Sequence, residues 1–300
     1  MKKIFSFAII FIALTTNLIA KEHVIEVNIP LKENIDNEQI LNECFSYSIK
    51  EEIEKILPYK IDEEKLNRIL DYLKRNNLID DFVLFYKEKE IERNSEFLKK
   101  HVIVGLNSLQ IKKFLKDTGF YYAPLYGWKC FIDLNGLNNK FLNDLQDIIS
   151  ISNCTSINSS DYDVSIEIGC DKKCTLVWGR MNYKDYGWEV TDKSINNLWL
   201  RLWDNFIKIT PIEKRFTKNI LLSINGLGTI FELRQIDKEL KSDLVLIVDK
   251  MKLAGFKVKP WGIVGEWNIQ ILPSKIDVLK SSLDRILSSK ALQYCIEEGL

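Results

Sequence analysis

The stretch Ile166–Trp178, IEIGCDKKCTLVW, joins two runs of β-forming residues through a short polar loop with a cysteine on each side. Two such runs separated by a few turn-forming residues are typical of a β-hairpin. Facing residues of an antiparallel pair have Cα atoms ~4.5–5.5 Å apart, a separation that a disulfide accepts. We therefore predict a hairpin whose two strands are joined by a Cys170–Cys174 disulfide.

The remaining cysteines leave several pairings open. Cys130 and Cys154 flank the first strand and helix of the same region, and they can pair with each other or with the hairpin cysteines, since four cysteines allow three connectivities. Cys44 falls on the apolar face of a helix pattern and is read as a buried thiol, whereas Cys295 is not assigned. A zinc site would need two more ligands beside the cysteine loop, so we expect no metal and no cofactor.

The hairpin belongs to a region, 128–209, with the pattern order β-α-β-β-β-α. A preceding region, 21–122, reads as β-α-α-β-β-α. The following region, 212–300, reads as β-α-β-β-β-α, with strands expected at 244–253, 256–263 and 266–272. This organisation predicts an α+β fold of three small domains, each a mostly antiparallel sheet with helices packed on one face. The aromatic segment FYYAPLYGW, 120–128, is expected to pack between the first two domains.

The first twenty residues predict export. Lys2 and Lys3 precede an apolar core, and Ala20 offers a small residue before the charged start at Lys21. This is the layout of a signal peptide over residues 1–20, and no cysteine follows the cleavage point to carry a lipid anchor. The apolar core is shorter than the ~20 residues of a membrane-spanning helix. We expect a periplasmic or secreted protein that meets the membrane only through its signal peptide.

Charge and histidine content narrow the functional classes. The chain has 42 basic and 42 acidic residues, so it lacks the basic excess of a nucleic-acid-binding protein. Its two histidines, His23 and His101, are both read as surface residues, and no nucleophile-elbow motif is present. The stretch NGLGT, 225–229, is similar to part of a dinucleotide loop, but Phe231 stands where its third glycine would fall, so a turn into a helix explains it better. We identify no catalytic residue.

Several apolar residues are candidates for an interaction surface. The helix pattern at 195–209 has an apolar arc of roughly 200°, wider than the ~100° of a one-faced helix, which indicates two neighbours. The second neighbour is either an adjoining domain or another protein, and the second reading would leave Leu200, Trp203 and Ile207 exposed. Tyr126 in the aromatic segment and Trp261 in KVKPWGIVGEW are further candidates, although the latter stretch also fits a strand with one wet face.

The order of these segments carries a resemblance. The run VIVGLNSLQIKKFLKDTGFYYAPLYGW is followed by DYDVSIEIG, by the tryptophan-bearing LVWGRMNYKDYGWEV and finally by LLSINGLGTIFELRQIDKELK. This organisation resembles a family of uncharacterised exported bacterial proteins known as a domain of unknown function. It is more distantly similar to flagellar assembly protein T, and the middle domain resembles the amino-terminal module of Tol-Pal protein B. The cysteine hairpin departs from these patterns.

The resemblance implies a periplasmic, non-enzymatic adaptor whose partner is another envelope protein, and it brings no catalytic residues to carry over. The alternative hypothesis is a secreted hydrolase, or a protein that binds a small ligand or glycan, with a polar site around His101.

Overall fold

The computed structural model describes residues 20–30, 36–93, 97–124 and 126–298. Except for Ala20, the expected signal peptide lies outside these residues. The chain divides into two compact units, Met1–Thr210 and Pro211–Leu300. Three mostly antiparallel sheets with helices packed on them confirm the predicted α+β class. Within the described ranges, no helix is both long and apolar enough to cross a membrane.

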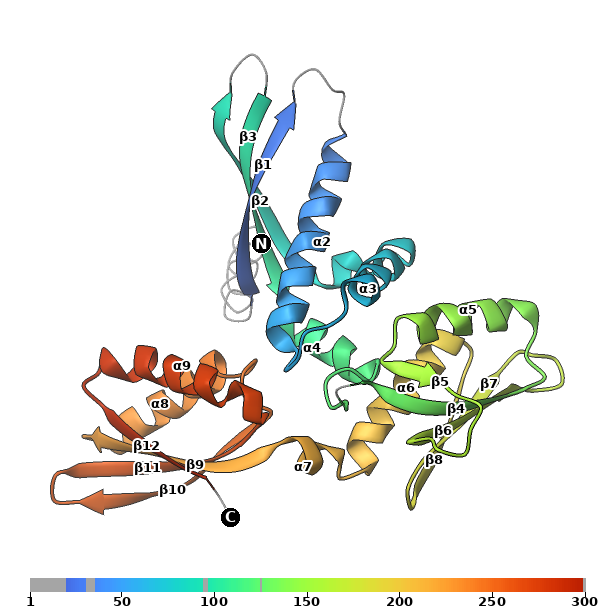
Figure 1. Cartoon of the computed structure of the whole chain (residues 1–300). Helices are drawn as coiled ribbons and strands as arrows, with labels where there is room; N and C mark the ends of the chain where they lie inside the picture. Colours follow the sequence, from blue (N-terminus) through green and yellow to red (C-terminus); the bar gives the residue numbers. More distant parts are fainter. Residues whose placement is uncertain (1–19, 31–35, 94–96, 125, 299–300) are drawn as a thin grey trace, which may run out of the picture. The chain divides into compact units, whose positions relative to one another are not determined.

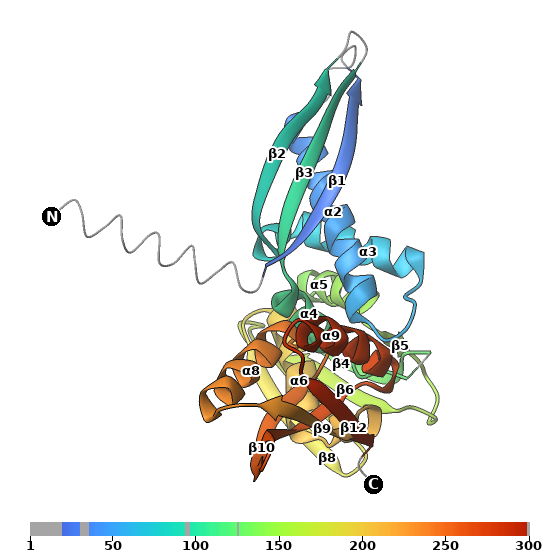
Figure 2. The same cartoon turned by 90° about the vertical axis from the view of Figure 1, so that its left-hand side faces the viewer.

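The first sheet of unit 1 has three antiparallel strands in the order β1-β3-β2. The two longest helices beside it begin at Asp36 and Asp62, whose carboxylates accept backbone N–H bonds. Figure 2 shows the three strands side by side in front of α2, which packs against β3. The elements are β1 (Ala20–Pro30), α2 (Asn37–Ile56), α3 (Glu63–Arg75), η1 (Ile79–Asp81), β2 (Val83–Arg93), β3 (Phe97–Asn107) and α4 (Ser108–Asp117).

The second sheet of unit 1 is mixed, with the strand order β5-β4-β6-β7-β8. Strands β5 and β6 run parallel to β4, and the β6–β7 and β7–β8 pairs are antiparallel. The β6–β7 pair is the predicted cysteine hairpin. The elements are β4 (Trp128–Asn135), α5 (Asn139–Ser150), β5 (Cys154–Ser156), β6 (Val164–Cys170), β7 (Val177–Tyr183), β8 (Tyr186–Asp192) and α6 (Ile195–Ile209), and Figure 1 shows α5 above the sheet.

The first aromatic residues of the segment between these two sheets are buried. Phe120, Tyr121 and Tyr122 are almost inaccessible to solvent. The Tyr59 hydroxyl donates to the carbonyl of Phe120 at 2.8 Å and accepts from Asn153 Nδ2 at 3.1 Å. These contacts tie the first predicted domain to the second, and the predicted join at 120–128 falls within one compact unit.

Unit 2 is a four-stranded antiparallel sheet in the order β10-β11-β9-β12. Its sequence of elements, β-α-β-β-α-β, with this strand order is the split β-α-β arrangement of ferredoxin-like domains. Two helices and the sheet enclose a core that includes Trp267, Leu240 and Leu283. After α7 (Ile212–Phe216), the elements are β9 (Lys218–Leu227), α8 (Ile230–Asp243), β10 (Lys250–Lys259), β11 (Gly262–Ile271), η2 (Pro273–Lys275), α9 (Ile276–Ser288) and β12 (Gln293–Glu298).

Two predictions about unit 2 are wrong. The strands expected at 244–253, 256–263 and 266–272 are instead a single hairpin, β10–β11. Leu244 and Val248 enter the core from the turn after α8, β10 continues through a bulge between Leu253 and Gly255, and the hairpin turn falls at Pro260 and Trp261. The last strand, β12, was not predicted. It pairs with β9, and its edge position tolerates the charged sequence QYCIEE.

Candidate functional site

The prediction that Trp203 forms part of an exposed patch is wrong. Its side chain has 0% of its surface exposed and packs against Trp128, Trp199 and Phe206. Its ring also lies against Gly119, whose φ of +76° suits a glycine, with 3.0 Å separating the ring from an ideal Cβ. Trp203 is therefore a core residue of unit 1.

The wide apolar arc of α6 is explained by two neighbours within unit 1. One side of the helix packs on β7 and β8, and the other side meets α4 and α5. This is the first of the two readings of the arc, a contact with an adjoining part of the same chain. Leu200 and Ile207 remain partly exposed, but without Trp203 they do not form the expected patch.

Tyr126 and Trp261 are both exposed, as expected. Tyr126 has 91% of its surface accessible and stands in the loop before β4. Trp261, with 71% accessible, occupies the turn of the β10–β11 hairpin. Tyr126 belongs to unit 1 and Trp261 to unit 2.

Trp261 lies at one end of unit 2 together with other exposed apolar side chains. We call this group the hairpin-end patch and define it by five residues. Val258 is 73% exposed, and Phe256 on the same strand is about half exposed. The N-terminus of α8 lies beside the hairpin turn (Figure 1). Strand β9 ends at Leu227, which pairs with Ile263 near the start of β11, and α8 begins three residues after Leu227. The five residues are Ile230, Phe231, Phe256, Val258 and Trp261.

A β-bulge turns two of these side chains to the helix-bearing face. The register of β10 shifts between Leu253 and Gly255, so the following residues change face. Phe256 then pairs with Gly265, over which Leu233 of α8 lies. Phe256 therefore continues the apolar surface of the core beyond the point where α8 covers it.

His101 lies on the outer face of the first sheet of unit 1. Its Nε2 is 3.5 Å from Glu26 Oε2, and Lys99 Nζ is 2.8 Å from the other oxygen of that carboxylate. Lys99 and His101 lower the pKa of Glu26, mainly through the hydrogen bond from Lys99. The arrangement is a charged strand surface.

The reading of His23 as a surface residue is wrong. It lies on β1 opposite Val104 and is buried. Its Nδ1 is 3.0 Å from Glu51 Oε2 and its Nε2 is 3.1 Å from Glu52 Oε2, both on α2. The imidazole therefore lies between two carboxylates in a cluster of three residues. No sequence spacing indicates the cluster, because it joins residues from a strand and a distant helix.

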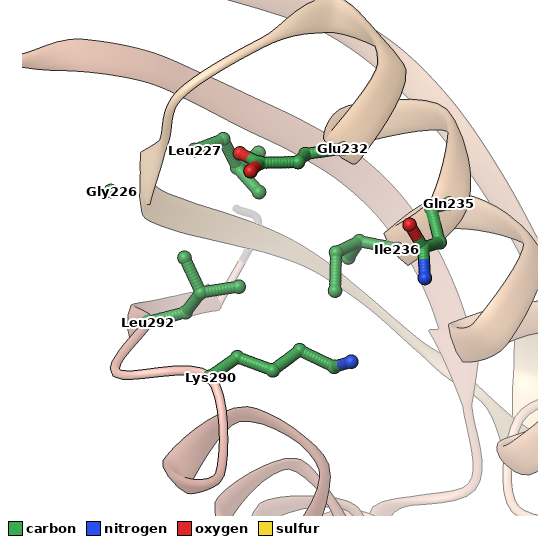
Figure 3. Close-up of a pocket in the computed structure, with 7 residues that line it drawn as sticks. All are labelled: Gly226, Leu227, Glu232, Gln235, Ile236, Lys290 and Leu292. Carbon is green, nitrogen blue, oxygen red and sulfur yellow. The ribbon is translucent and has the colours of Figure 1, made fainter.

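A small pocket lies beside the NGLGT segment, between β9, α8 and the turn before β12. Its volume is about 260 Å³, below the 300–1,000 Å³ range of typical ligand sites. Thr229 and Glu232 form the start of α8, since Glu232 N donates to Thr229 Oγ1 and Gly228 N donates to Glu232 Oε2. The segment is therefore a helix cap, as expected. Figure 3 shows the lining residues Gly226, Leu227, Glu232, Gln235, Ile236, Lys290 and Leu292.

Two disulfides stabilise the second sheet of unit 1. Cys170, the last residue of β6, is bonded to Cys174 inside the hairpin loop, and Cys130 is bonded to Cys154 between β4 and β5. The prediction that the two hairpin cysteines face each other on opposite strands is wrong, because the register partner of Cys170 is Val177 and the loop is longer than DKK. Both pairings were among those considered from the sequence. Disulfides persist in oxidising compartments, so the two bonds fit a protein located outside the cytoplasm. Cys44 is a buried free thiol, as expected, and burial raises its pKa, whereas Cys295 is an exposed free thiol.

Comparisons with known proteins do not assign a family. No family model matches the sequence, and no curated protein matches it. One similar solved structure is described as an unknown protein from Galdieria sulphuraria. The alignment has 9% identity and a TM-score of 0.21, and it covers 94% of this chain and 99% of that one. A TM-score this low carries no argument about fold or function.

Proposed function

We propose that this chain is an exported, non-enzymatic adaptor that binds another envelope protein through the hairpin-end patch of unit 2. The observation that carries the proposal is the exposure of Trp261 and Val258, each more than two-thirds accessible, beside further exposed apolar residues. Contiguous apolar surface on a protein is typical of an interaction site, and tryptophan is enriched among the residues that dominate binding energy.

The charges around the patch favour a partner with an acidic rim. β10 contributes four lysines to the face opposite the helices, namely Lys250, Lys252, Lys257 and Lys259. Lys250 pairs with Glu213 and Lys257 pairs with Glu266. Within the described residues, Lys252 and Lys259 have no ion pair. A partner that buries Trp261 would meet this positive edge, and complementary charge would orient it.

The hydrolase hypothesis receives no comparable support. An active site brings a nucleophile or general base together with groups that stabilise developing charge in a concave site. His101 stands on a sheet face beside Glu26 and Lys99, and the pocket in unit 2 is small and formed by a helix cap.

Site-specific photocrosslinking tests the adaptor proposal. A photoreactive amino acid in place of Trp261 should capture a discrete envelope protein in the exported fraction of the native host. The same amino acid in place of Val278, which is exposed on α9 and belongs to neither the hairpin-end patch nor the lysine-bearing face, serves as the matched control. The partner should also be lost when Val258 is replaced by Asp. Equal capture at both positions, or recovery of the chain in the cytosol, would contradict the proposal.

A further inference from the structure

The second sheet of unit 1 has an outer face that its helices do not cover. Along β4, β6 and β7, buried side chains alternate with accessible ones. The buried set, which includes Ile166 and Met181, faces α5 and α6. The accessible set forms the outer face together with two residues of β8 and with Gly169, which is buried under Trp178. The accessible residues are Phe131, Asp133, Asn135, Ser165, Glu167, Trp178, Arg180, Asn182, Glu189 and Thr191.

Aromatic rings lie at two opposite corners of this outer face. Trp178 is the register partner of Gly169, and an ideal Cβ on that glycine would lie 2.6 Å from the indole ring. The indole therefore covers the Gly169 backbone and turns its other side to solvent. At the second corner, Phe131 stacks on Tyr162 with ring centroids 5.6 Å apart, and the two side chains are 37% and 44% exposed.

A row of planar polar groups crosses the sheet between the aromatic corners. Asp133, Glu167, Arg180 and Glu189 are successive register partners on four strands. Arg180 pairs with Glu189 at 3.1 Å and is 4.0 Å from Glu167. Asn135 Nδ2 also donates to Glu167 at 3.1 Å. Among the described residues, the Asp133 side chain has no hydrogen bond or ion pair, so its carboxylate is free to accept from a ligand.

This combination of groups is suited to sugars. A pyranose ring presents flat C–H faces that pack on aromatic rings, and its edge carries hydroxyl groups that bond to carboxylates, amides and guanidinium groups. The row holds three carboxylates and one guanidinium group, so the face repels anionic polymers. Phe131 and Trp178 are separated by two strand spacings across the sheet and by four residues along the strands. From the usual strand spacing and rise per residue, the distance between their backbone positions is about 16 Å. That span exceeds the length of a single monosaccharide.

We propose that the outer face of this sheet binds an oligosaccharide of β-linked pyranoses that carries no acidic groups. The sugar rings stack on Trp178 and Phe131, and their hydroxyl groups bond to Asp133 and to the Arg180 row. This site goes beyond the adaptor function, since it belongs to unit 1 and shares no residue with the hairpin-end patch.

Calorimetric titration of the full chain with N-acetylchitohexaose and with cellohexaose tests the proposal. Polygalacturonate, an acidic polymer, serves as the anionic comparison. The structure predicts saturable binding of at least one neutral hexamer and none of polygalacturonate. Trp178→Ala should weaken binding by about tenfold, which corresponds to about 1.4 kcal/mol of stacking. Trp261→Ala, which removes an exposed tryptophan from unit 2, should leave the affinity unchanged.

Two further variants separate binding from folding. Trp178→Phe keeps a ring over Gly169 and should retain part of the affinity. Asp133→Ala removes a carboxylate without partners among the described residues, so it should weaken binding while the thermal unfolding profile stays unchanged. The proposal is overturned if neither neutral hexamer binds at millimolar concentration. It is also overturned if binding is unaffected by both Trp178→Phe and Asp133→Ala, or if polygalacturonate binds as tightly as the neutral hexamers.

Discussion

The contact between strand β1 and helix α2 depends on a single residue, His23. It connects β1 to α2 through two carboxylates, one of which, Glu52, is fully buried. Replacing His23 with Ala removes the ring from between two carboxylates, and we expect a loss of about 3 kcal/mol in the free energy of unfolding. His101→Ala is the matched control, since its contact with Glu26 is exposed and should contribute less than about 1 kcal/mol. Urea unfolding of both variants measures the difference, and equal costs would show that the buried cluster is not stabilising.

The partly buried ammonium group of Lys65 should make the free energy of unfolding depend on pH, and one substitution isolates this effect. Its ammonium group donates to the Ser150 carbonyl at 2.6 Å, and burial lowers its pKa to about 8. The folded state therefore releases this proton between about pH 8 and the ordinary lysine pKa of ~10.4, while the unfolded chain keeps it. Because the unfolded state binds more protons in this window, rising pH favours folding.

The comparison with Lys65→Met makes this effect measurable. At pH 7 Lys65 is charged in the folded wild type, so burial of that charge lowers the free energy of unfolding. By pH 10 the folded state has released the proton, and most of this destabilisation is gone. The unfolding free energy of wild type relative to Lys65→Met should therefore increase by about 1 kcal/mol between pH 7 and pH 10, allowing for solvent screening of this side chain. Denaturant unfolding at several pH values measures it. A constant difference between the two proteins would mean that Lys65 titrates normally.

At the scale of elements, the two disulfides should differ in their contributions to stability. The Cys130–Cys154 bond closes a chain separation of 24 residues and the Cys170–Cys174 bond a separation of 4. From loop entropy alone, the first contributes about 3.5 kcal/mol and the second about 2 kcal/mol. Cys130→Ser/Cys154→Ser should therefore lower the melting temperature more than Cys170→Ser/Cys174→Ser. Calorimetry of the two double variants under oxidising conditions checks the order, and the reverse order would argue against it.

Elements whose signals are local could be predicted from the sequence, and those that depend on distant partners could not. The β6–β7 hairpin was read from its cysteine spacing, and α6 from its apolar periodicity. The exposure of Trp203 was misread because two of the residues that cover it, Trp128 and Gly119, are distant in sequence. β12 was missed because pairing with β9, rather than its own composition, makes it a strand.

The candidate sites also divide into one with a local sequence signal and one that depends on partners distant in sequence. Trp261 was identified from the sequence as an exposed residue because it alternates with Lys257 and Lys259, but it was placed within a strand, whereas the structure has it in the turn of the β10–β11 hairpin. The outer face of the second sheet was missed, since Asp133, Arg180 and Trp178 become neighbours only through the register of β4, β6 and β7. Alternation along one strand shows which residues share a face, but it does not show which strands are adjacent.

At the scale of the whole molecule, the two compact units have separate cores. The core of unit 2 is formed by its own sheet and helices, and both disulfides belong to unit 1. We therefore expect each unit to unfold in a transition of its own, which only the stabilising interactions within that unit affect. This separation allows each unit to be perturbed without changing the other.

We accordingly predict two calorimetric transitions that respond to different perturbations. A reductant should lower only the transition of unit 1, because cleaving the disulfides increases the entropy of that unfolded unit. Leu283→Ala, at a fully buried position in α9, should lower only the other transition, at a cost of about 3 kcal/mol from the lost transfer energy and the cavity. Leu176→Ala, at an exposed position in unit 1, is the control that should move neither. A single transition that shifts with both the reductant and Leu283→Ala would show that the units unfold cooperatively, and the separate cores would then not act as independent folding units.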